Sequence, residues 1–286
     1  MLSILKISAI SFLVGFYVIE GILGDTHNVT NFPSSSTEKS TSTISSNPTN
    51  FTNPNKILGG DRAQVGQFPH QVAMLKGSFQ FCGGSLISTR HVLTAAHCTT
   101  GQYAGDITVR VGSINSQYEG VVIQVAYIII HPQFNRAITD YDLSILVLQE
   151  PVLLSGDITP VRLPSIFNSR LTVGTVCQVS GWGATEDGGP TTPHLMYIDL
   201  AIVSWEYCKE KHETLTENMI CAGGEYNMDA CQGDSGSPLV LKSDSFSKVQ
   251  VGIVSWGNGC GQYGVPGIYT DVGRFSGWIT QQMLSS

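Results

Sequence analysis

The stretch Asp229-Ala230-Cys231-Gln232-Gly233-Asp234-Ser235-Gly236-Ser237-Pro238 places hydroxyls, two carboxylates and a cysteine between glycines. Because glycine adopts backbone conformations that other residues resist, Ser235 can stand on a sharp turn with its hydroxyl exposed. Neighbouring N–H groups can then converge on one point, which suits nucleophilic attack on a carbonyl group and stabilisation of the oxyanion. Such a loop can also be an ordinary polar turn, so the chain must supply a base and an orienting carboxylate elsewhere.

Two further segments carry the side chains that this chemistry needs. Thr94-Ala95-Ala96-His97-Cys98 follows an apolar run, and residues 140–148 place carboxylates at the start of an apolar strand. A neutral imidazole would take the hydroxyl proton, and a carboxylate would fix its tautomer and stabilise the imidazolium. A lone histidine is more often structural, and we assign that role to His70, His91, His131, His194 and His212.

The composition indicates a globular, mildly acidic protein. The chain has 286 residues, 42% of them apolar, with 31 glycines and a formal net charge of -7. This length allows one large core or two small ones. No run of basic residues suggests a nucleic-acid partner, and the modest negative charge bears on solubility more than on partners.

The first 24 residues or so have the pattern of a secretory signal peptide. Lys6 provides the positive start, residues 7–19 form a short apolar run, and Gly21 and Gly24 are small residues after it. The run is short for a transmembrane helix, so we expect a secreted, extracellular protein without stable membrane association. A membrane-tethered form retained by residues 7–19 is the alternative.

Residues 25–56 are rich in Ser, Thr, Asn and Pro and almost free of large apolar side chains. Such a segment buries too little surface to offset its ordering entropy, so we expect a disordered propeptide. Asn28 and Asn50 each begin a glycosylation sequon.

From Ile57 onward the sequence consists of short β-like runs separated by Gly, Pro, Asn and Asp. This pattern favours antiparallel barrels or a sandwich. Phe275, Trp278, Ile279 and Met283 recur at helical spacing after a potential cap at Asp271, which predicts a closing helix. The predicted strands are 108–111, 121–130, 143–148, 176–180, 196–203, 238–241 and 249–256.

Essentially the whole chain from Ile57 to Ser286 resembles the chymotrypsin family of serine proteases, in its trypsin branch. This resemblance implies an all-β fold of two packed antiparallel six-stranded β-barrels with a C-terminal helix. Besides the stretch 229–238, the matching motifs are Ile57-Leu58-Gly59-Gly60, Phe81-Cys82-Gly83-Gly84-Ser85-Leu86-Ile87, Leu93-Thr94-Ala95-Ala96-His97-Cys98, Asp142-Leu143, Ser180-Gly181-Trp182-Gly183, Ser255-Trp256-Gly257 and Pro266-Gly267-Ile268-Tyr269.

The resemblance also implies the catalytic roles. Ser235 would be the nucleophile, His97 the general base and then acid, and Asp142 the orienting carboxylate. Asp140 stays an alternative to Asp142, although only Asp142 directly precedes the apolar strand. The N–H groups of Gly233 and Ser235 would form the oxyanion hole. The residues from Ser255 to Gly257 would bind substrate backbone, with Ser255 beside the triad carboxylate.

Asp229 lies where the family places the floor of the pocket for the side chain before the scissile bond. Gly257 and Gly267 lie where its walls fall and would leave the shaft open. A carboxylate below an apolar shaft favours Arg or Lys, because a buried charge left unpaired is costly. The expected partners are therefore protein or peptide substrates, together with protein protease inhibitors.

The start of the matching region implies activation by cleavage. Cutting after Lys56 would free the α-amino group of Ile57, which in the family pairs with the aspartate before the nucleophile, here Asp234. We therefore expect a zymogen, activated by a trypsin-like protease or by itself.

Three departures from the family pattern bear on the site. Ser237 stands where the family usually has glycine, and a positive φ there would strain a serine. Ser113 stands where many trypsins carry the first acidic calcium ligand, and Pro266 stands where sodium-activated relatives carry an aromatic residue. We therefore expect neither a metal nor a cofactor.

The chain has seven cysteines, so one remains unpaired by the family pattern. The resemblance pairs Cys82 with Cys98, Cys208 with Cys221, and Cys231 with Cys260. Cys177 is left as a free thiol, since the family's partner position for it is Leu241 here. A disulfide-linked dimer is the alternative. The sequence has no obvious assembly segment, so we expect a monomer.

The leading hypothesis is thus a secreted, trypsin-like serine endopeptidase. The alternative function is a non-catalytic serine protease homologue that acts as a binding or regulatory protein. Such homologues generally lack a triad member, and this chain retains all three.

Overall fold

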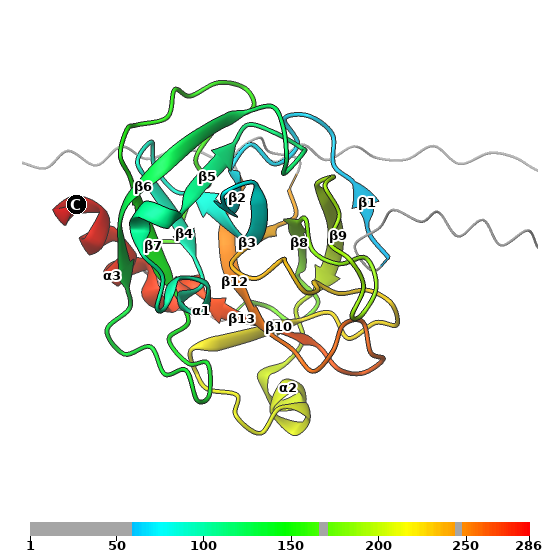
Figure 1. Ribbon diagram of the computed structural model, residues 1–286. Coiled ribbons are helices and arrows are strands. Elements are labelled where there is room, and N and C mark those ends of the chain that lie inside the picture. The colour runs from blue at the N-terminus through cyan, green and yellow to red at the C-terminus, as the bar shows by residue number, and fades with distance from the viewer. Residues whose placement is uncertain (1–58, 166–170, 244–247) are drawn as a thin grey trace, which may run out of the picture. The chain divides into compact units, whose positions relative to one another are not determined.

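The computed structural model describes residues 59–165, 171–243 and 248–286, and Figure 1 shows their strands and helices. The predicted signal peptide, the propeptide with Asn28 and Asn50, and the bond between Lys56 and Ile57 all lie outside these residues. Within the described ranges, no helix combines the length and the apolar character needed to cross a bilayer.

The first half of the described chain forms a closed antiparallel barrel in the order β2-β3-β4-β7-β6-β5, with β5 pairing back to β2. Branched aliphatic side chains dominate these strands, which suits a pleated and buried surface. Every position of β4 and β7 is buried, as expected for strands covered on both faces. The six strands are β2 (Gln71–Lys76), β3 (Phe79–Leu86), β4 (His91–Thr94), β5 (Thr108–Val111), β6 (Val121–Ile130) and β7 (Ser144–Leu148).

The second half forms an antiparallel sheet in the order β1-β9-β8-β11-β12-β13-β10. A bridge between Ile202 and Ala222 joins the end of β9 to β10. The six strands from β9 to β10 in this order therefore also close on themselves, with β1 outside the ring. β1 adds to β9 as a seventh strand, which the expectation of six did not include. The strands are β1 (Asp61–Arg62), β8 (Val176–Gly181), β9 (Met196–Ala201), β10 (Met219–Ala222), β11 (Pro238–Leu241), β12 (Gln250–Trp256) and β13 (Gly267–Asp271).

The predicted closing helix is α3 (Val272–Ser285). The Asp271 carboxylate accepts a hydrogen bond from the Gly273 N–H and so caps the helix start. Phe275 and Ile279 are buried in the same core cluster as Ile253 of β12, which ties the helix to both barrels. The other helical elements are α1 (Ala96–Thr99), the 3₁₀ turn η1 (Ala104–Asp106) and α2 (Trp205–Lys211). The all-β architecture with a C-terminal helix is therefore confirmed.

Buried polar side chains join the two barrels. Gln71 of β2 accepts a hydrogen bond from Ser180 Oγ of β8 at 2.7 Å and donates one to Ser237 Oγ at 3.2 Å. Ser85 of β3 donates to Gln250 of β12 at 2.5 Å. Because buried polar groups are costly when unpaired, these bonds specify how the barrels meet.

Cysteine pairing follows the family pattern. Cys177 is the one cysteine outside the bridges, is fully buried, and lies opposite Leu241 in the pairing of β8 with β11. Burial raises the pKa of the Cys177 thiol to about 12. The three disulfides are Cys82–Cys98, Cys208–Cys221 and Cys231–Cys260.

We predict that Cys177 reacts with thiol reagents only after unfolding. A buried thiol with a raised pKa offers neither access nor thiolate, so native protein should take up almost no label at pH 8. Denaturation without reductant should expose one label per chain, located on Cys177 by peptide mapping. The Cys177→Ala variant is the control and should take up none. Rapid labelling of the native protein, or a dimer that only reductant separates, would contradict the prediction.

Candidate active site

His97 and Asp142 meet at the edge of the first barrel. β4 ends just before α1, which carries His97, and Asp142 lies two residues before β7. The His97 Nδ1 atom is 2.7 Å from Asp142 Oδ2, and the His97 backbone N–H donates to Asp142 Oδ1 at 2.8 Å. The side chain of Asp142 is fully buried, whereas that of His97 is 28% exposed. One carboxylate thus holds both the ring and the backbone of the histidine.

The second barrel supplies further donors to Asp142. Ser255 Oγ of β12 donates to Asp142 Oδ2 at 2.6 Å, and Thr270 Oγ1 of β13 donates to the Asp142 carbonyl at 2.8 Å. An ionised carboxylate only accepts hydrogen bonds, so this shell suits the charged form and puts the His97 proton on Nδ1. The Nε2 lone pair is then free to accept a proton.

Asp140, the alternative carboxylate, is engaged elsewhere. Its Oδ1 atom accepts hydrogen bonds from Thr216 Oγ1 at 2.9 Å and from Asn218 Nδ2 at 3.0 Å. Among the described residues it makes no bond to His97. Asp142, and not Asp140, is therefore the carboxylate that contacts the histidine.

Ser235 lies on a tight turn just before β11. Gly233 and Gly236 on either side have φ values of 97° and 82°, in the region that favours glycine. The Asp234 N–H closes the turn by donating to the Cys231 carbonyl at 3.0 Å. The N–H groups of Gly233 and Ser235 donate to no protein acceptor in the described part of the chain, so both are available to an incoming oxygen.

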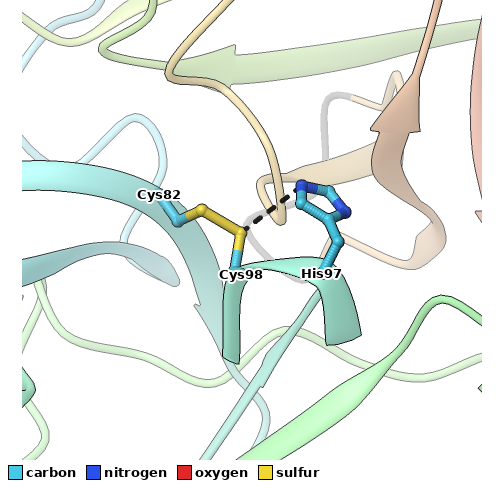
Figure 2. A group of neighbouring side chains, drawn as sticks. All are labelled: Cys82, His97 and Cys98. Carbon is cyan, nitrogen blue, oxygen red and sulfur yellow. Dashed lines mark hydrogen bonds between the residues drawn. A yellow bond between two sulfur atoms is a disulfide. The ribbon is translucent and has the colours of Figure 1, made fainter. Parts of the chain in front are cut away.

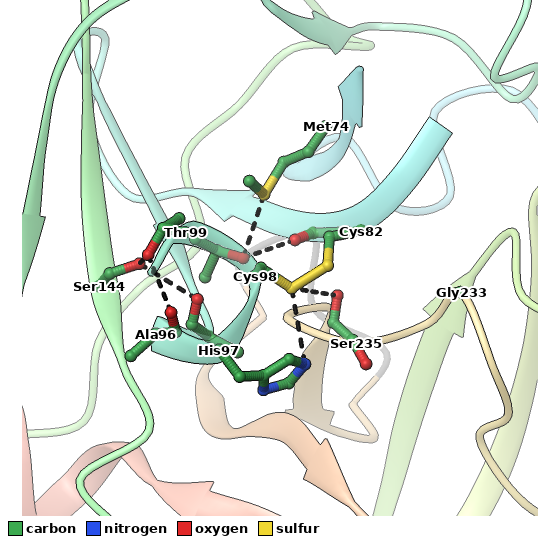
Figure 3. Close-up of a disulfide and its surroundings, with 12 residues drawn as sticks. Met74, Cys82, Ala96, His97, Cys98, Thr99, Ser144, Gly233 and Ser235 are labelled. Carbon is green, nitrogen blue, oxygen red and sulfur yellow. Dashed lines mark hydrogen bonds between the residues drawn. A yellow bond between two sulfur atoms is a disulfide. The ribbon is translucent and has the colours of Figure 1, made fainter. Parts of the chain in front are cut away.

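β3 of the first barrel holds this turn in place. The Gly83 N–H donates to the Ser235 carbonyl at 2.8 Å, and Gln80 Nε2 donates to the Gly233 carbonyl at 3.0 Å. Figure 3 shows Ser235 and the His97 ring on the same side of the Cys82–Cys98 disulfide. The contacts of the described residues include no His97 Nε2 to Ser235 Oγ hydrogen bond. Such bonds are often long without substrate and tighten in the complex.

Two clusters have the spacing of metal ligands, but neither has suitable chemistry. Figure 2 shows Cys82, His97 and Cys98 together, with His97 Nε2 at 3.7 Å from Cys98 Sγ. The two sulfurs are bonded to each other and cannot act as thiolates, the form in which cysteine binds zinc, so His97 is the one ligand left in this cluster. The cluster of Asp187, Cys231 and Cys260 has the same defect.

Asp234 is a fully buried carboxylate behind the turn. It accepts hydrogen bonds from the Gly183 N–H at 2.7 Å and the Cys231 N–H at 3.0 Å. A Cβ atom on Gly181 would lie 2.0 Å from Asp234 Oδ1, so glycine there makes room for the carboxylate. Burial raises the pKa of Asp234 to about 6, opposed by these two N–H groups. No ion pair to Asp234 occurs among the described side chains.

Asp229 lines a cavity of about 160 Å³ that opens beside Ser235. The residue is 5% exposed, and its carboxylate accepts a hydrogen bond from the Gly261 N–H at 3.1 Å. Burial raises the pKa of Asp229 to about 7, against the lowering effect of backbone hydrogen bonds. Gly257 and Gly267 also line the cavity, and a Cβ atom on Gly267 would lie 2.8 Å from Asp229 Oδ1. The cavity is therefore an open shaft above a carboxylate.

Comparison with known proteins agrees with this geometry, since residues 57–279 match the family model described as Trypsin. The chain belongs to the trypsin family of serine proteases. It is 40% identical over 237 residues to cationic trypsin-3 of Rattus norvegicus, covering 81% of this chain and 91% of that protein. Identity to trypsin 5G1 of Aedes aegypti is 38% over 231 residues, covering 79% and 84%. Identity to transmembrane protease serine 9 of Rattus norvegicus is 34% over 238 residues, covering 81% of this chain and 22% of that protein.

Sequence reasoning missed three side chains of this trypsin-family site. Thr270 donates to the Asp142 carbonyl, and Gln80 donates to the Gly233 carbonyl. Tyr269 lines the cavity, and its buried hydroxyl has no hydrogen-bond partner among the described residues. Tyr269 stood in a motif that matched the family, and Thr270 follows it directly. Nothing in the local sequence singles out Gln80, because its role depends on how β3 meets the turn.

We predict that Asp229→Asn stabilises the uncleaved protein at pH 8 but not at pH 4. The raised pKa of Asp229 means that the folded protein retains a proton that the unfolded chain loses between roughly pH 4 and 7. The stability of the wild type should therefore fall across that window relative to a neutral amide. The gain at pH 8 should be about 1–3 kcal/mol, or roughly 2–4 °C in Tm for each kcal/mol.

Thermal melting at the two pH values measures this difference. Asp199→Asn is the matched control, since Asp199 is partly exposed and forms an ion pair with Lys242. That variant should gain nothing at pH 8. Equal effects of Asp229→Asn at both pH values would show that burial does not govern the ionisation of Asp229.

Proposed function

We propose that this trypsin-family protein is a secreted serine endopeptidase, made as a zymogen and activated by cleavage after Lys56, that hydrolyses peptide bonds after Arg and Lys. One observation carries the proposal. A buried Asp142 holds His97, whose ring lies on the same side of the Cys82–Cys98 disulfide as Ser235 (Figure 3), and the N–H groups of Gly233 and Ser235 have no acceptor among the described residues. This is the arrangement needed for acyl transfer through a serine nucleophile.

In the proposed mechanism Ser235 Oγ attacks the scissile carbonyl carbon while His97 Nε2 takes the hydroxyl proton. The carbonyl oxygen becomes an oxyanion and accepts hydrogen bonds from the N–H groups of Gly233 and Ser235. Asp142 stabilises the imidazolium. The tetrahedral intermediate then collapses: its C–N bond breaks, His97 protonates the departing amine, and an acyl-enzyme remains. Water, deprotonated by His97, then attacks the ester, and the proton returns to Ser235.

Specificity for Arg and Lys rests on the shaft above Asp229. A guanidinium or ammonium entering it would pair with a buried carboxylate that has no cationic partner among residues 59–165, 171–243 and 248–286, and an apolar guest would leave that charge unpaired. Gly257 and Gly267 leave the shaft open, and Ser255 to Gly257 would bind substrate backbone as an added strand. Two of the relatives are named trypsins, which supports the family assignment on which this proposed specificity rests.

Activation rests on Asp234. Its carboxylate is buried with a raised pKa, and a cation would stabilise its charged form. The α-amino group of Ile57, freed by cleavage after Lys56, would supply that cation and so hold the turn that positions Gly233 and Ser235. An activating trypsin-like protease or the enzyme itself would make the cut, because Lys56 suits the proposed pocket.

Secretion and processing rest on the sequence before Ile57. Residues 1–24 would direct export, and Asn28 and Asn50 would carry glycans on the propeptide 25–56. We propose a monomer that acts on proteins or peptides and is inhibited by protein protease inhibitors. The alternative, a non-catalytic homologue, is less favoured because His97, Asp142 and Ser235 are all present.

We predict that a fluorophosphonate probe labels the protein on Ser235, and only after cleavage at Lys56. Cleavage would supply the Ile57 ammonium that organises the turn, so the uncleaved chain should label at least about 100-fold more slowly. Labelling is measured by mass spectrometry after treatment with immobilised trypsin and removal of the beads.

Two variants separate the possible results. Ser235→Ala should be cleaved but not labelled, and Lys56→Gln should be neither cleaved there nor labelled. Protein with a proven Ile57 terminus that takes up no probe would favour the non-catalytic homologue. Fast labelling of the uncleaved chain would contradict the zymogen proposal.

We also predict that the activated enzyme cleaves after Arg and Lys, and that Asp229→Ser removes this preference. The loss of the charge-assisted contact should lower kcat/KM for Arg substrates by several kcal/mol of transition-state stabilisation, on the order of 10³-fold or more. Peptide-library profiling measures the change. The control Asp199→Ser should keep the wild-type profile, and equal wild-type rates after Phe and Arg would refute the pocket assignment.

A further inference from the structure

The residue before Asp142 has a backbone conformation that its side chain disfavours. Tyr141 has a φ of 53°, and Thr139 nearby has a φ of 52°. Bulky and β-branched residues rarely adopt this left-handed region, since Cβ then crowds the backbone. Such conformations persist only where the surroundings over-determine them, so the packing around Tyr141 must hold it there.

An aromatic cluster surrounds Tyr141. Its ring stacks on His131 with centroids 5.0 Å apart and planes 19° apart, and it meets Phe275 edge-on at 5.7 Å. His131 in turn contacts Phe275 at 5.3 Å and Trp278 at 4.7 Å. Because Phe275 and Trp278 belong to α3 and His131 follows β6, the C-terminal helix braces the segment that leads into Asp142.

The stack is apolar in character. Burial lowers the pKa of His131, opposed by the charge of Asp140, so the ring is neutral at pH 7. Its Nδ1 accepts the Gln133 N–H at 3.3 Å. The hydroxyl of Tyr141 makes no hydrogen bond among the described residues, so the ring alone makes the contacts.

The backbone passes this constraint to Asp142. The Leu143 N–H donates to the Tyr141 carbonyl at 2.9 Å, which makes Asp142 the centre of a one-residue turn. The His131 N–H donates to the Leu143 carbonyl at 3.1 Å. A change in the Tyr141 backbone would therefore tilt the Asp142 carboxylate relative to His97.

We propose that Tyr141 is a positioning residue, whose stack against His131 and α3 holds the backbone turn that aims Asp142 at His97. The inference rests on the proposed function, because it assigns Tyr141 to the geometry of the catalytic pair. Tyr141 acts through Asp142 and contacts neither Ser235 nor the floor of the specificity pocket.

The proposal has a signature that a merely stabilising residue would not give. A misaligned Asp142 stabilises the His97 imidazolium less when that cation forms during turnover. The acidic limb of the kcat/KM profile should then move to lower pH, kcat should decrease, and KM and the Arg/Lys preference should stay unchanged.

The test compares Tyr141→Ala, Tyr141→Phe and Tyr141→Asn in the activated enzyme. Phe keeps the ring and should lie within about twofold of wild type, because the hydroxyl is unbonded. Ala loses the stack and tolerates the left-handed backbone poorly, so kcat should drop by roughly ten- to a hundredfold. Asn adopts left-handed φ more readily than Ala and should recover part of that loss. The control Tyr127→Ala removes a partly exposed ring on β6 and should change nothing.

A second measurement does not depend on turnover. Proton NMR follows the resonance of the His97 Nδ1–H proton as the pH changes. Because this proton lies in the hydrogen bond to Asp142, its resonance reports on that bond directly. A His97 Nδ1–H resonance displaced from its wild-type position in Tyr141→Ala, and unmoved in Tyr141→Phe, supports the proposal. Identical kcat, pH profile and His97 Nδ1–H resonance in all three variants overturn it. An inactive wild type with a proven Ile57 terminus would overturn the proposed function, while the NMR comparison would still decide the role of Tyr141. If Tyr141→Ala does not fold, Tyr141→Asn against Tyr141→Phe decides the same question.

Discussion

The carboxylate of Asp142 is buried with no Lys or Arg partner in the described part of the chain, and the geometry of the site depends on which groups donate hydrogen bonds to its oxygens. Its donors are the ring and backbone of His97 and the hydroxyl of Ser255. Thr270 binds the Asp142 carbonyl as well. These groups come from α1, β12 and β13, so the charge can be kept inside only where both barrels are correctly joined. The requirement to satisfy one buried charge therefore links the assembly of the fold to the alignment of the histidine.

Asp229 and Asp234 are buried in a different way from Asp142. Each is buried, and its hydrogen-bond donors among the described residues are backbone N–H groups. Burial raises the pKa of Asp229 to about 7 and that of Asp234 to about 6. A carboxylate in this state lacks the cation that would stabilise its charge. Under the proposed function, substrate and the new N-terminus would provide those cations at Asp229 and Asp234. The cost of burying the two carboxylates would then become binding energy for a basic side chain and for the activated form.

How far the sequence predicts this structure depends on whether a feature is local. The strands 108–111, 121–130 and 238–241 have the predicted limits, because branched residues bounded by turn signals define them. The capped helix after Asp271 is equally local. The pairing of β1 with β9 was not predicted, since a two-residue strand has no periodic pattern. The contacts of Asp142 with His97 and Ser255 followed from the family resemblance, whereas the roles of Gln80 and the left-handed Tyr141 did not. Both depend on long-range packing that spacing along the chain does not encode.

Ser237 shows how one departure from a family pattern is accommodated. A serine with positive φ would be strained, but Ser237 is not among the residues with that conformation. Its hydroxyl is fully buried and accepts a hydrogen bond from Gln71, which in turn accepts one from Ser180. The space it fills is bounded by Gly83, where a Cβ atom would lie 1.9 Å from Ser237 Oγ. Because Gly83 also donates its N–H to the Ser235 carbonyl, the same close approach of β3 accommodates Ser237 and fixes the turn of Ser235. Ser237 thus adds a hydrogen bond between the two barrels next to the turn of Ser235, where the alignment of the barrels sets the geometry of the site.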